Sequence, residues 1–331
     1  MDKYFLNIRR FILLYNIFIR RVRLKGHTQM LKYAFKRLFL RQEIPMTIMI
    51  ALTYRCQCRC VHCSASDLSD QAGEELTTAE CRDVIREASE RGFIKVGITG
   101  GEPLLRDDIV EIVHFAYRTG MSVSIDTNGI LLTEQMVREL KDAGITNINV
   151  SLDHPDEKYH NRLRRYKNCF KHALEGIDHC VQQRIPCVVS TYITDRSFEN
   201  NELDKMIALA KELKSTAVRC LFPIHSGKFS QKKRSLLSPV NKQKFFDTYA
   251  DGSFVYSESP MFDFQTGQLE CSALKKLSVY LTAYGDLKYC HVSNNVLGNI
   301  RSESLSEILN RNEYSSPENR IKLNCQTFHD Q

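Results

Sequence analysis

The stretch ALTYRCQCRCVHCSAS, residues 51–66, holds four of the chain's twelve cysteines within eight residues. It overlaps the end of TIMIALT, residues 47–53, an apolar run that predicts a buried strand. In parallel βα structures, chemistry gathers where strands end and loops begin. The stretch therefore raises two linked questions: which fold continues from this strand, and what the four thiols bind.

An alternation of strand and helix patterns continues from this stretch for about 175 residues and predicts six βα units. Further strand patterns begin near residues 93, 121, 145, 185 and 216, and the segments between them have helical periodicity, with Thr before the helix or Gly after it in several. Such alternation predicts an α/β fold with a parallel sheet and right-handed crossovers. Because no seventh or eighth unit follows, we expect an open, partial (β/α)6 barrel rather than a closed (β/α)8 barrel.

The βα region lies between two segments of different character, which divides the chain into residues 1–45, 46–225 and 226–331. The first part holds eleven Lys or Arg against Asp2 and Glu43, a local charge of +9. The remaining 286 residues therefore carry −2 of the net +7. A nearly neutral body gives no reason to expect nucleic-acid binding.

The basic N-terminal part predicts two amphipathic helices separated by Gly26. Its apolar run, residues 11–19, is too short to span a bilayer. Such helices either cover an open end of the barrel or lie on an anionic membrane surface or a protein partner, and both can hold at once. The apolar stripes are formed by Phe5, Ile8, Ile12, Tyr15 and Ile19, and by Leu31, Phe35, Leu38 and Phe39.

The four clustered cysteines allow several kinds of site. Twelve cysteines spread through a large chain without a secretion signal favour metal binding in a reducing cytoplasm over a disulfide framework. A redox pair of Cys60 and Cys63 leaves Cys56 unexplained, and a zinc site with adjacent His62 and Cys63 is geometrically difficult. A 4Fe–4S cube fits better, since Cys56, Cys60 and Cys63 can each bind a different iron and leave the fourth open. Cys58 lies between these ligands, and we expect it to be a bystander.

Together with TGGEPLLR, residues 99–106, the C-x3-C-x2-C spacing resembles the radical S-adenosylmethionine (radical SAM) superfamily over residues 46–225. The resemblance implies that Cys56, Cys60 and Cys63 hold a 4Fe–4S cluster whose open iron is chelated by SAM. Reductive cleavage of SAM would then give a 5′-deoxyadenosyl radical that abstracts a substrate hydrogen.

The resemblance also implies a set of SAM contacts on the next loops. Gly100, Gly101 and Glu102 match the segment that meets the SAM amino group, where glycine permits close approach and a carboxylate accepts from an ammonium. HNRLR, residues 160–164, resembles a segment of many relatives that makes its last arginine a candidate for the SAM carboxylate. That arginine is Arg164, and the remaining candidate SAM contacts are Asn128, Ser151 and Asp153.

The C-terminal part resembles the SPASM and twitch extensions of radical SAM enzymes. Cys271, Gly285 and Cys290 match their C-x9–15-G-x4-C opening, and GNIRSESLSEIL, residues 298–309, resembles the segment that follows. The resemblance implies an auxiliary 4Fe–4S cluster on Cys271, Cys290 and Cys325. Because no further cysteines follow, the shorter twitch form with one auxiliary cluster is expected.

The resemblance makes oxidative modification of a peptide or protein the leading function, with an external electron donor such as flavodoxin or ferredoxin. The alternative is dehydrogenation or rearrangement of a small metabolite or a lipid-like substrate. A more remote alternative is a non-catalytic iron–sulfur scaffold protein. The segment GGEP, residues 100–103, argues against this alternative, since a scaffold has no need to bind SAM. We expect a cytoplasmic protein, with residues 1–45 as the candidate for peripheral membrane contact.

Overall fold

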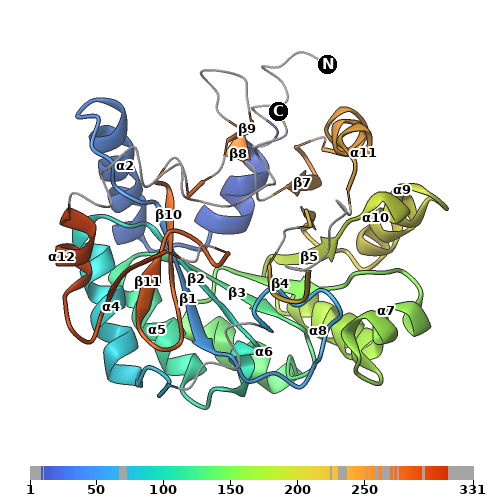
Figure 1. Cartoon of the computed structure of the whole chain (residues 1–331), viewed down its shortest axis with the longest axis horizontal. Coiled ribbons are helices and arrows are strands. Elements are labelled where there is room, and N and C mark those ends of the chain that lie inside the picture. Colours follow the sequence, from blue (N-terminus) through green and yellow to red (C-terminus); the bar gives the residue numbers. More distant parts are fainter. Residues whose placement is uncertain are drawn as a thin grey trace.

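The computed structural model describes most of the chain and shows an open α/β barrel (Figure 1). The described residues are 9, 11–66, 73–223, 226–229, 237–250, 252–257, 261–262, 269–270, 272–273, 276–292 and 295–311. Cys271 and Cys325, two of the predicted auxiliary ligands, lie outside them.

Six parallel strands form the middle of one ten-stranded sheet, which confirms the predicted α/β partial barrel. They follow each other in chain order, each paired in parallel with the next. The sheet does not close, since its edges are strands β12 and β7. The six are β1 (Thr47–Thr53), β2 (Lys95–Gly100), β3 (Ser122–Thr127), β4 (Asn147–Ser151), β5 (Cys187–Tyr192) and β6 (Ala217–Leu221).

The C-terminal part extends this sheet at both edges. Strand β7 (Val255–Ser257) pairs in parallel with β6, and β10 (Ser278–Leu281) pairs in parallel with β1. Strands β11 (Asp286–Lys288) and β12 (Val296–Asn299) continue from β10 as an antiparallel meander. Sequence patterns missed β7 because three residues are too few to show a period. A separate pair, β8 (Met261–Phe262) and β9 (Leu269–Glu270), completes the described strands.

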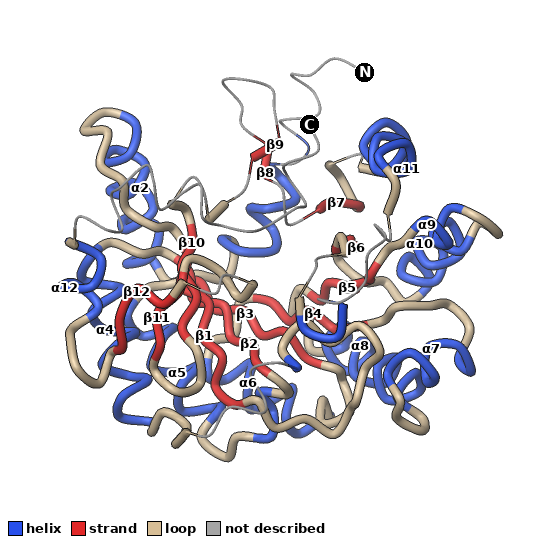
Figure 2. The backbone as a smooth tube through the Cα atoms, viewed as in Figure 1, coloured by secondary structure: helices blue, strands red, loops and turns tan. Residues whose placement is uncertain are grey.

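Helices cover the outer face of the sheet, as the tube view in Figure 2 shows. Thr77 caps α4 with a reciprocal capping box, and Gly92 ends it with φ of 105°. The crossover helices are α4 (Thr78–Arg91), α5 (Ile109–Thr119), α6 (Glu134–Ala143), α8 (Cys169–Gln182) and α10 (Glu202–Glu212). The shorter helices are η2 (Pro103–Leu105), α7 (Glu157–Arg164), α9 (Asp195–Phe198), η3 (Gly227–Phe229), α11 (Pro239–Lys244), η4 (Phe245–Tyr249) and α12 (Leu305–Asn310).

The residues between β4 and α8 show no helical periodicity, so the sequence predicts a long loop there, and this prediction was wrong. Helix α7 occupies its second half, begun by the Asp156 side chain, which accepts from the backbone N–H of Tyr159. Its sequence is so polar that no apolar stripe marks it, and His160 is its one buried residue.

The N-terminal part packs against the inner face of the barrel through η1 (Tyr15–Ile19) and continues into α2 (Leu24–Leu38). Leu13 and Ile17 are buried in one cluster with Val188, Ala217 and Tyr256 from β5, β6 and β7. Alternation along a strand places these side chains opposite the face that carries the crossover helices. The segment therefore fills part of the interior that an open barrel leaves uncovered.

Candidate active site

The cysteine loop leaves β1 and is fastened to the end of α7. The backbone N–H groups of Arg59 and Val61 donate to the carbonyls of Arg164 and Leu163, at 3.2 and 2.9 Å. These carbonyls belong to the last turn of α7, where the backbone C=O groups have no N–H donor within the helix. The loop is thus held by helix-end hydrogen bonds, and it brings its thiols to the carboxyl ends of the strands.

The three predicted ligands lie on this loop with different exposure. Cys56 is exposed, Cys63 is half-buried and Cys60 is buried. Cys58 packs with Cys60 and with Cys169, the first residue of α8. Among the described residues, no three Cys, His, Asp or Glu side chains share a single-ion geometry. A 4Fe–4S cube takes each thiolate at a separate iron and does not require that convergence.

Gly100 and Gly101 bring the loop after β2 against the backbone of the cysteine loop. A Cβ on Gly100 would lie 2.1 Å from the Thr53 carbonyl oxygen, and one on Gly101 would lie 2.4 Å from that of Arg55. Gly100 also has a φ of 132°, which favours glycine. The backbone N–H of Gly101 donates to the Thr53 carbonyl at 2.7 Å. Both positions therefore require glycine for the protein's own loop packing.

Glu102 is fully buried and ties the loops after β2 and β3 together. Its Oε1 accepts from the Leu104 N–H at 3.1 Å and from the Thr127 hydroxyl at 2.8 Å. Its Oε2 accepts from the Asn128 N–H at 2.8 Å. Burial raises the pKa of Glu102 to about 7, against the three hydrogen bonds, which favour the carboxylate. A carboxylate has about four acceptor positions, so one remains on Oε2.

Asn128 connects the loop after β3 to the cysteine loop. Its side-chain nitrogen lies 3.8 Å from Cys56 Sγ and donates to the Gln57 side chain at 3.2 Å. Its side-chain oxygen accepts from the Ile130 N–H at 2.8 Å, which caps the turn. Asn128 therefore positions the loop as well as facing a predicted ligand.

Asp153 and Arg164, predicted separately as SAM contacts, form a buried ion pair with each other. Arg164 Nε lies 2.7 Å from Asp153 Oδ2, and His62 Nε2 lies 3.3 Å from the same oxygen. Although burial opposes it, the Arg164 and His62 charges hold the pKa of Asp153 well below its usual range. Arg164 also places Nη1 at 3.8 Å from Cys60 Sγ. Charges from the loop after β4 and from α7 thus converge on the cysteine loop.

Two neighbouring histidines support this pair. His160 is buried, and its Nδ1 accepts from the Asp153 N–H at 3.1 Å. The His62 ring stacks on Tyr192 at 4.9 Å between centroids and 9° between planes. Neither partner of His62 could be predicted from residue patterns, since Asp153 and Tyr192 are more than ninety residues away in the chain.

The inner face of the barrel carries a polar network that sequence reasoning missed. Asp126 Oδ1 accepts from Arg219 Nη2 at 2.7 Å and from Asn149 Nδ2 at 2.8 Å. Arg219 also donates to the Ser190 hydroxyl at 3.0 Å. These residues come from β3, β4, β5 and β6, and alternation along the strands is the sequence signal that could have placed them on one face. Ser151, the last residue of β4, lies half-buried on the same face.

The predicted auxiliary site is described at one of its three cysteines. Cys290 follows β11 and packs, half-buried, against the main core. Gly285 has a φ of 93° between β10 and β11, as the predicted hairpin requires. The site's ligand geometry lies outside the described residues.

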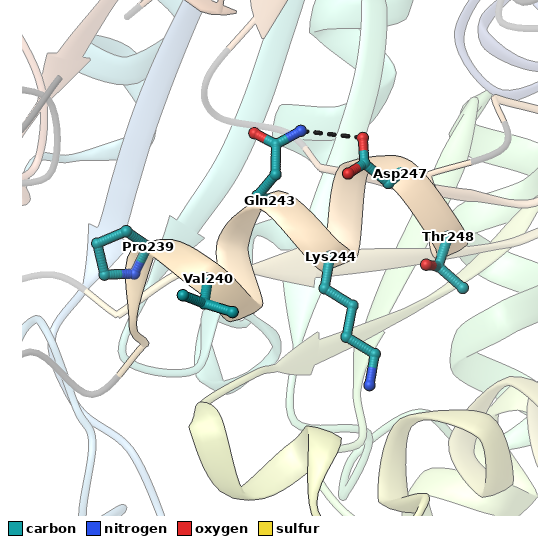
Figure 3. Close-up of a pocket in the computed structure, with 6 residues that line it drawn as sticks. All are labelled: Pro239, Val240, Gln243, Lys244, Asp247 and Thr248. Carbon is teal, nitrogen blue, oxygen red and sulfur yellow. Dashed lines mark hydrogen bonds between the residues drawn. The ribbon is translucent and has the colours of Figure 1, made fainter.

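A hollow lies on the outside of the molecule, over α11 and η4 (Figure 3). It is lined by Pro239, Val240, Gln243, Lys244, Asp247 and Thr248. Its carboxylate, Asp247, accepts from the Gln243 side chain at 2.9 Å. None of the predicted site residues lines it, so the strand ends hold the candidate site.

Family comparisons agree with this architecture and these loops. The model of the radical SAM superfamily matches residues 50–210, and that of the SPASM iron–sulfur cluster-binding domain matches residues 271–328. The chain therefore belongs to the radical SAM superfamily and carries a SPASM domain. Radical SAM domains imply a 4Fe–4S cluster with SAM, and SPASM domains hold auxiliary clusters.

Two curated relatives are similar to this chain over 200 residues, which is 60% of its length. An AdoMet-dependent heme synthase of Methanosarcina barkeri strain Fusaro is 34% identical, and a PqqA peptide cyclase of Bradyrhizobium diazoefficiens is 29% identical. The matched region spans 56% and 52% of these relatives, so their whole length is not represented here.

A solved structure shares the fold at low sequence identity. Streptococcus suis SuiB, bound to the precursor peptide SuiA, aligns with a TM-score of 0.67 and 16% identity. The alignment covers 85% of this chain and 68% of the other. It supports the overall architecture, including part of the C-terminal region.

Proposed function

We propose that this protein is a radical SAM enzyme that oxidatively modifies a peptide or protein. The observation that carries the proposal is the convergence of the cysteine loop, buried Glu102 and the Asp153–Arg164 pair at the carboxyl ends of the strands. The similarity to a PqqA peptide cyclase and the fold shared with SuiB favour a peptide substrate.

In this proposal Cys56, Cys60 and Cys63 hold the SAM-cleaving cluster. Three thiols on one loop suit a 4Fe–4S cube that keeps one iron for SAM. When bound, cluster and SAM supply a carbon-centred radical that removes one substrate hydrogen atom. Cys271, Cys290 and Cys325 would hold an auxiliary cluster, which would supply an acceptor for the electron that an oxidised substrate gives up together with a proton.

The protein's own residues would bind and orient SAM. The acceptor position left on Glu102 Oε2 would accept a hydrogen bond from the SAM ammonium group, and Gly100 and Gly101 keep the adjacent backbone close to the cysteine loop. Arg164 would bind the SAM carboxylate through the nitrogens not engaged by Asp153. Asn128, Ser151 and Asp153 would complete the contacts, and burial of Asp153 and Arg164 strengthens them by excluding water.

A small-molecule substrate is the second candidate, because the more similar of the two curated relatives is an AdoMet-dependent heme synthase. The two are separated by incubating the anaerobically reconstituted protein with SAM, dithionite and the short peptide encoded nearest its gene. Loss of a pair of hydrogens from that peptide by mass spectrometry supports the first. Unchanged peptide alongside 5′-deoxyadenosine formation refutes that peptide substrate and favours a metabolite.

A further inference from the structure

Helix α2 presents an apolar stripe that nothing in the described structure covers. Leu31, Phe35 and Leu38 are exposed at 72%, 54% and 66%, and Leu24 at 83%. The spacing of 7, 4 and 3 residues places all four on one side of the helix. Phe39, just beyond the helix end, is 73% exposed. Side chains of this size normally lie inside a protein, so the stripe needs an occupant.

The opposite side of α2 is the side that packs on the barrel. Gly26 is buried so closely that a Cβ would lie 2.1 Å from the Gly120 carbonyl oxygen. Gln29 donates to the Ser89 hydroxyl at 3.1 Å. Because Gly26 and Gln29 fix the inner side, the helix cannot turn its apolar stripe inward without losing these contacts.

Positive charge runs along the stripe. Lys25, Lys32 and Lys36 follow at spacings of 7 and 4 residues, so they form a row on one flank of the helix, between the apolar stripe and the side that packs on the barrel. No Asp or Glu occurs from residue 3 to residue 42. A helix with large apolar side chains on one side, lysines along its edge and no acidic residue fits the boundary of an anionic bilayer. A protein partner would have to match the same unbroken positive charge with an acidic apolar groove.

The position of α2 on the barrel determines which end of the strands would face a surface on which α2 docks. Arg21, just before α2, donates to the carbonyls of Ile145 and Arg184, both at 3.2 Å. These residues precede β4 and β5, so the N-terminal part lies at the amino ends of the strands. The cysteine loop lies at the carboxyl ends. In Figure 1, α2 projects at the upper left of the molecule.

We propose that α2 is an interfacial helix that docks this protein on anionic lipid bilayers, with the candidate active site facing away from the membrane. Leu24, Leu31, Phe35 and Leu38 enter the lipid headgroup–acyl boundary, and the lysine row contacts lipid phosphates. In this orientation the membrane anchors the enzyme and leaves the site open to a water-soluble substrate. Among the described residues, no helix is long and apolar enough to cross a bilayer.

The test is flotation of the full-length protein with vesicles of phosphatidylcholine containing about one-third phosphatidylglycerol, against pure phosphatidylcholine. We expect wild-type protein to float with the anionic vesicles. The double variant Leu31→Glu/Phe35→Glu should partition at least about tenfold more weakly. Val240→Glu on α11 is the matched control, because Val240 is 76% exposed outside the stripe.

A second variant tests the charge independently. Changing Lys25, Lys32 and Lys36 to Gln should weaken binding to anionic vesicles by about fivefold per lysine. Unchanged thermal unfolding of each variant shows that it is folded. If wild-type protein does not float, or the Leu31/Phe35 variant floats equally, the proposal is wrong. It is also overturned if the stripe mediates dimerisation in light scattering while vesicles bind nothing. Formation of 5′-deoxyadenosine in solution tests the proposed function separately.

Discussion

Replacing Glu102 with Gln removes one oxygen acceptor from a fully buried carboxylate that has three donors. The new amide presents an NH2 group where either the Asn128 N–H or the Leu104 N–H now donates. Neither backbone donor can turn away. The substitution therefore leaves at least one buried N–H unsatisfied and removes the negative charge that we assign to the SAM ammonium.

Two separate effects follow, one on stability and one on SAM binding. The unsatisfied donor should lower the free energy of unfolding by about 1–3 kcal/mol. Loss of the charge-assisted hydrogen bond to SAM should cost about 1.5–3 kcal/mol more in binding, or about 10- to 150-fold in SAM affinity. The control is Glu111→Gln, the same change in an exposed ion pair with Arg82, which should alter stability by less than about 1 kcal/mol.

The pH dependence gives a sharper signature. The carboxylate binds the ammonium, and the pKa of Glu102 is raised from 4.5 to about 7 in the SAM-free protein. SAM affinity should therefore fall by up to about tenfold per pH unit below 7 in wild type, and this dependence should disappear in Glu102→Gln. The folded protein takes up the proton more readily than the unfolded chain, so this group's contribution to stability is present below pH 4.5 and lost as pH rises through 7.

Equilibrium dialysis of SAM against the anaerobically reconstituted protein, with thermal unfolding of the same samples, measures both effects. If Glu102→Gln keeps wild-type SAM affinity with an unchanged pH profile while its stability falls, Glu102 is structural only. That outcome would refute its assignment to SAM.

The remaining predictions concern the N-terminal part, the buried ion pair and the auxiliary site. Ile17→Ala, which empties part of the barrel interior at a residue 1% exposed, should cost about 2–5 kcal/mol in unfolding free energy, whereas Ile12→Ala at 52% exposure should cost little by the same denaturant titration. Arg164→Met should destabilise by about 3–5 kcal/mol because it leaves the Asp153 carboxylate buried without its cation; a smaller change in chemical denaturation would contradict the buried pair. Cys290→Ala should lower bound iron from about eight to about four per chain, and an unchanged iron content would argue against Cys290 as a ligand.

The strands and their order were predictable because each pattern is local. Apolar β-branched runs marked β1 to β6, and a Thr before or a Gly after the run marked α4 and α6. Since the carboxyl ends of parallel strands meet at one edge, this order was enough to place the loops after β1, β2, β3 and β4 together. Two of the elements that the patterns missed, α7 and β7, lack a local period: α7 is nearly all polar and β7 has three residues.

The pairing of side chains within the site was not predictable in the same way. Asp153 and Arg164 were both assigned to SAM, yet they bind each other, because the last residue of α7 returns to the loop that follows β4. Glu102 was expected to face a ligand, and three donors from two loops already hold it. The Asp126–Arg219 pair joins strands more than ninety residues apart. Such contacts depend on strand register and loop path, which residue patterns leave open.

The measurement that tests the central claim most directly is 5′-deoxyadenosine formation by anaerobically reconstituted protein with SAM and dithionite. We expect wild type and Cys58→Ala to form it, and Cys60→Ala to form none while its fold, by circular dichroism, is kept. Absence of 5′-deoxyadenosine from fully iron-loaded wild type, or its formation by Cys60→Ala at the wild-type rate, would contradict the assignment of this site.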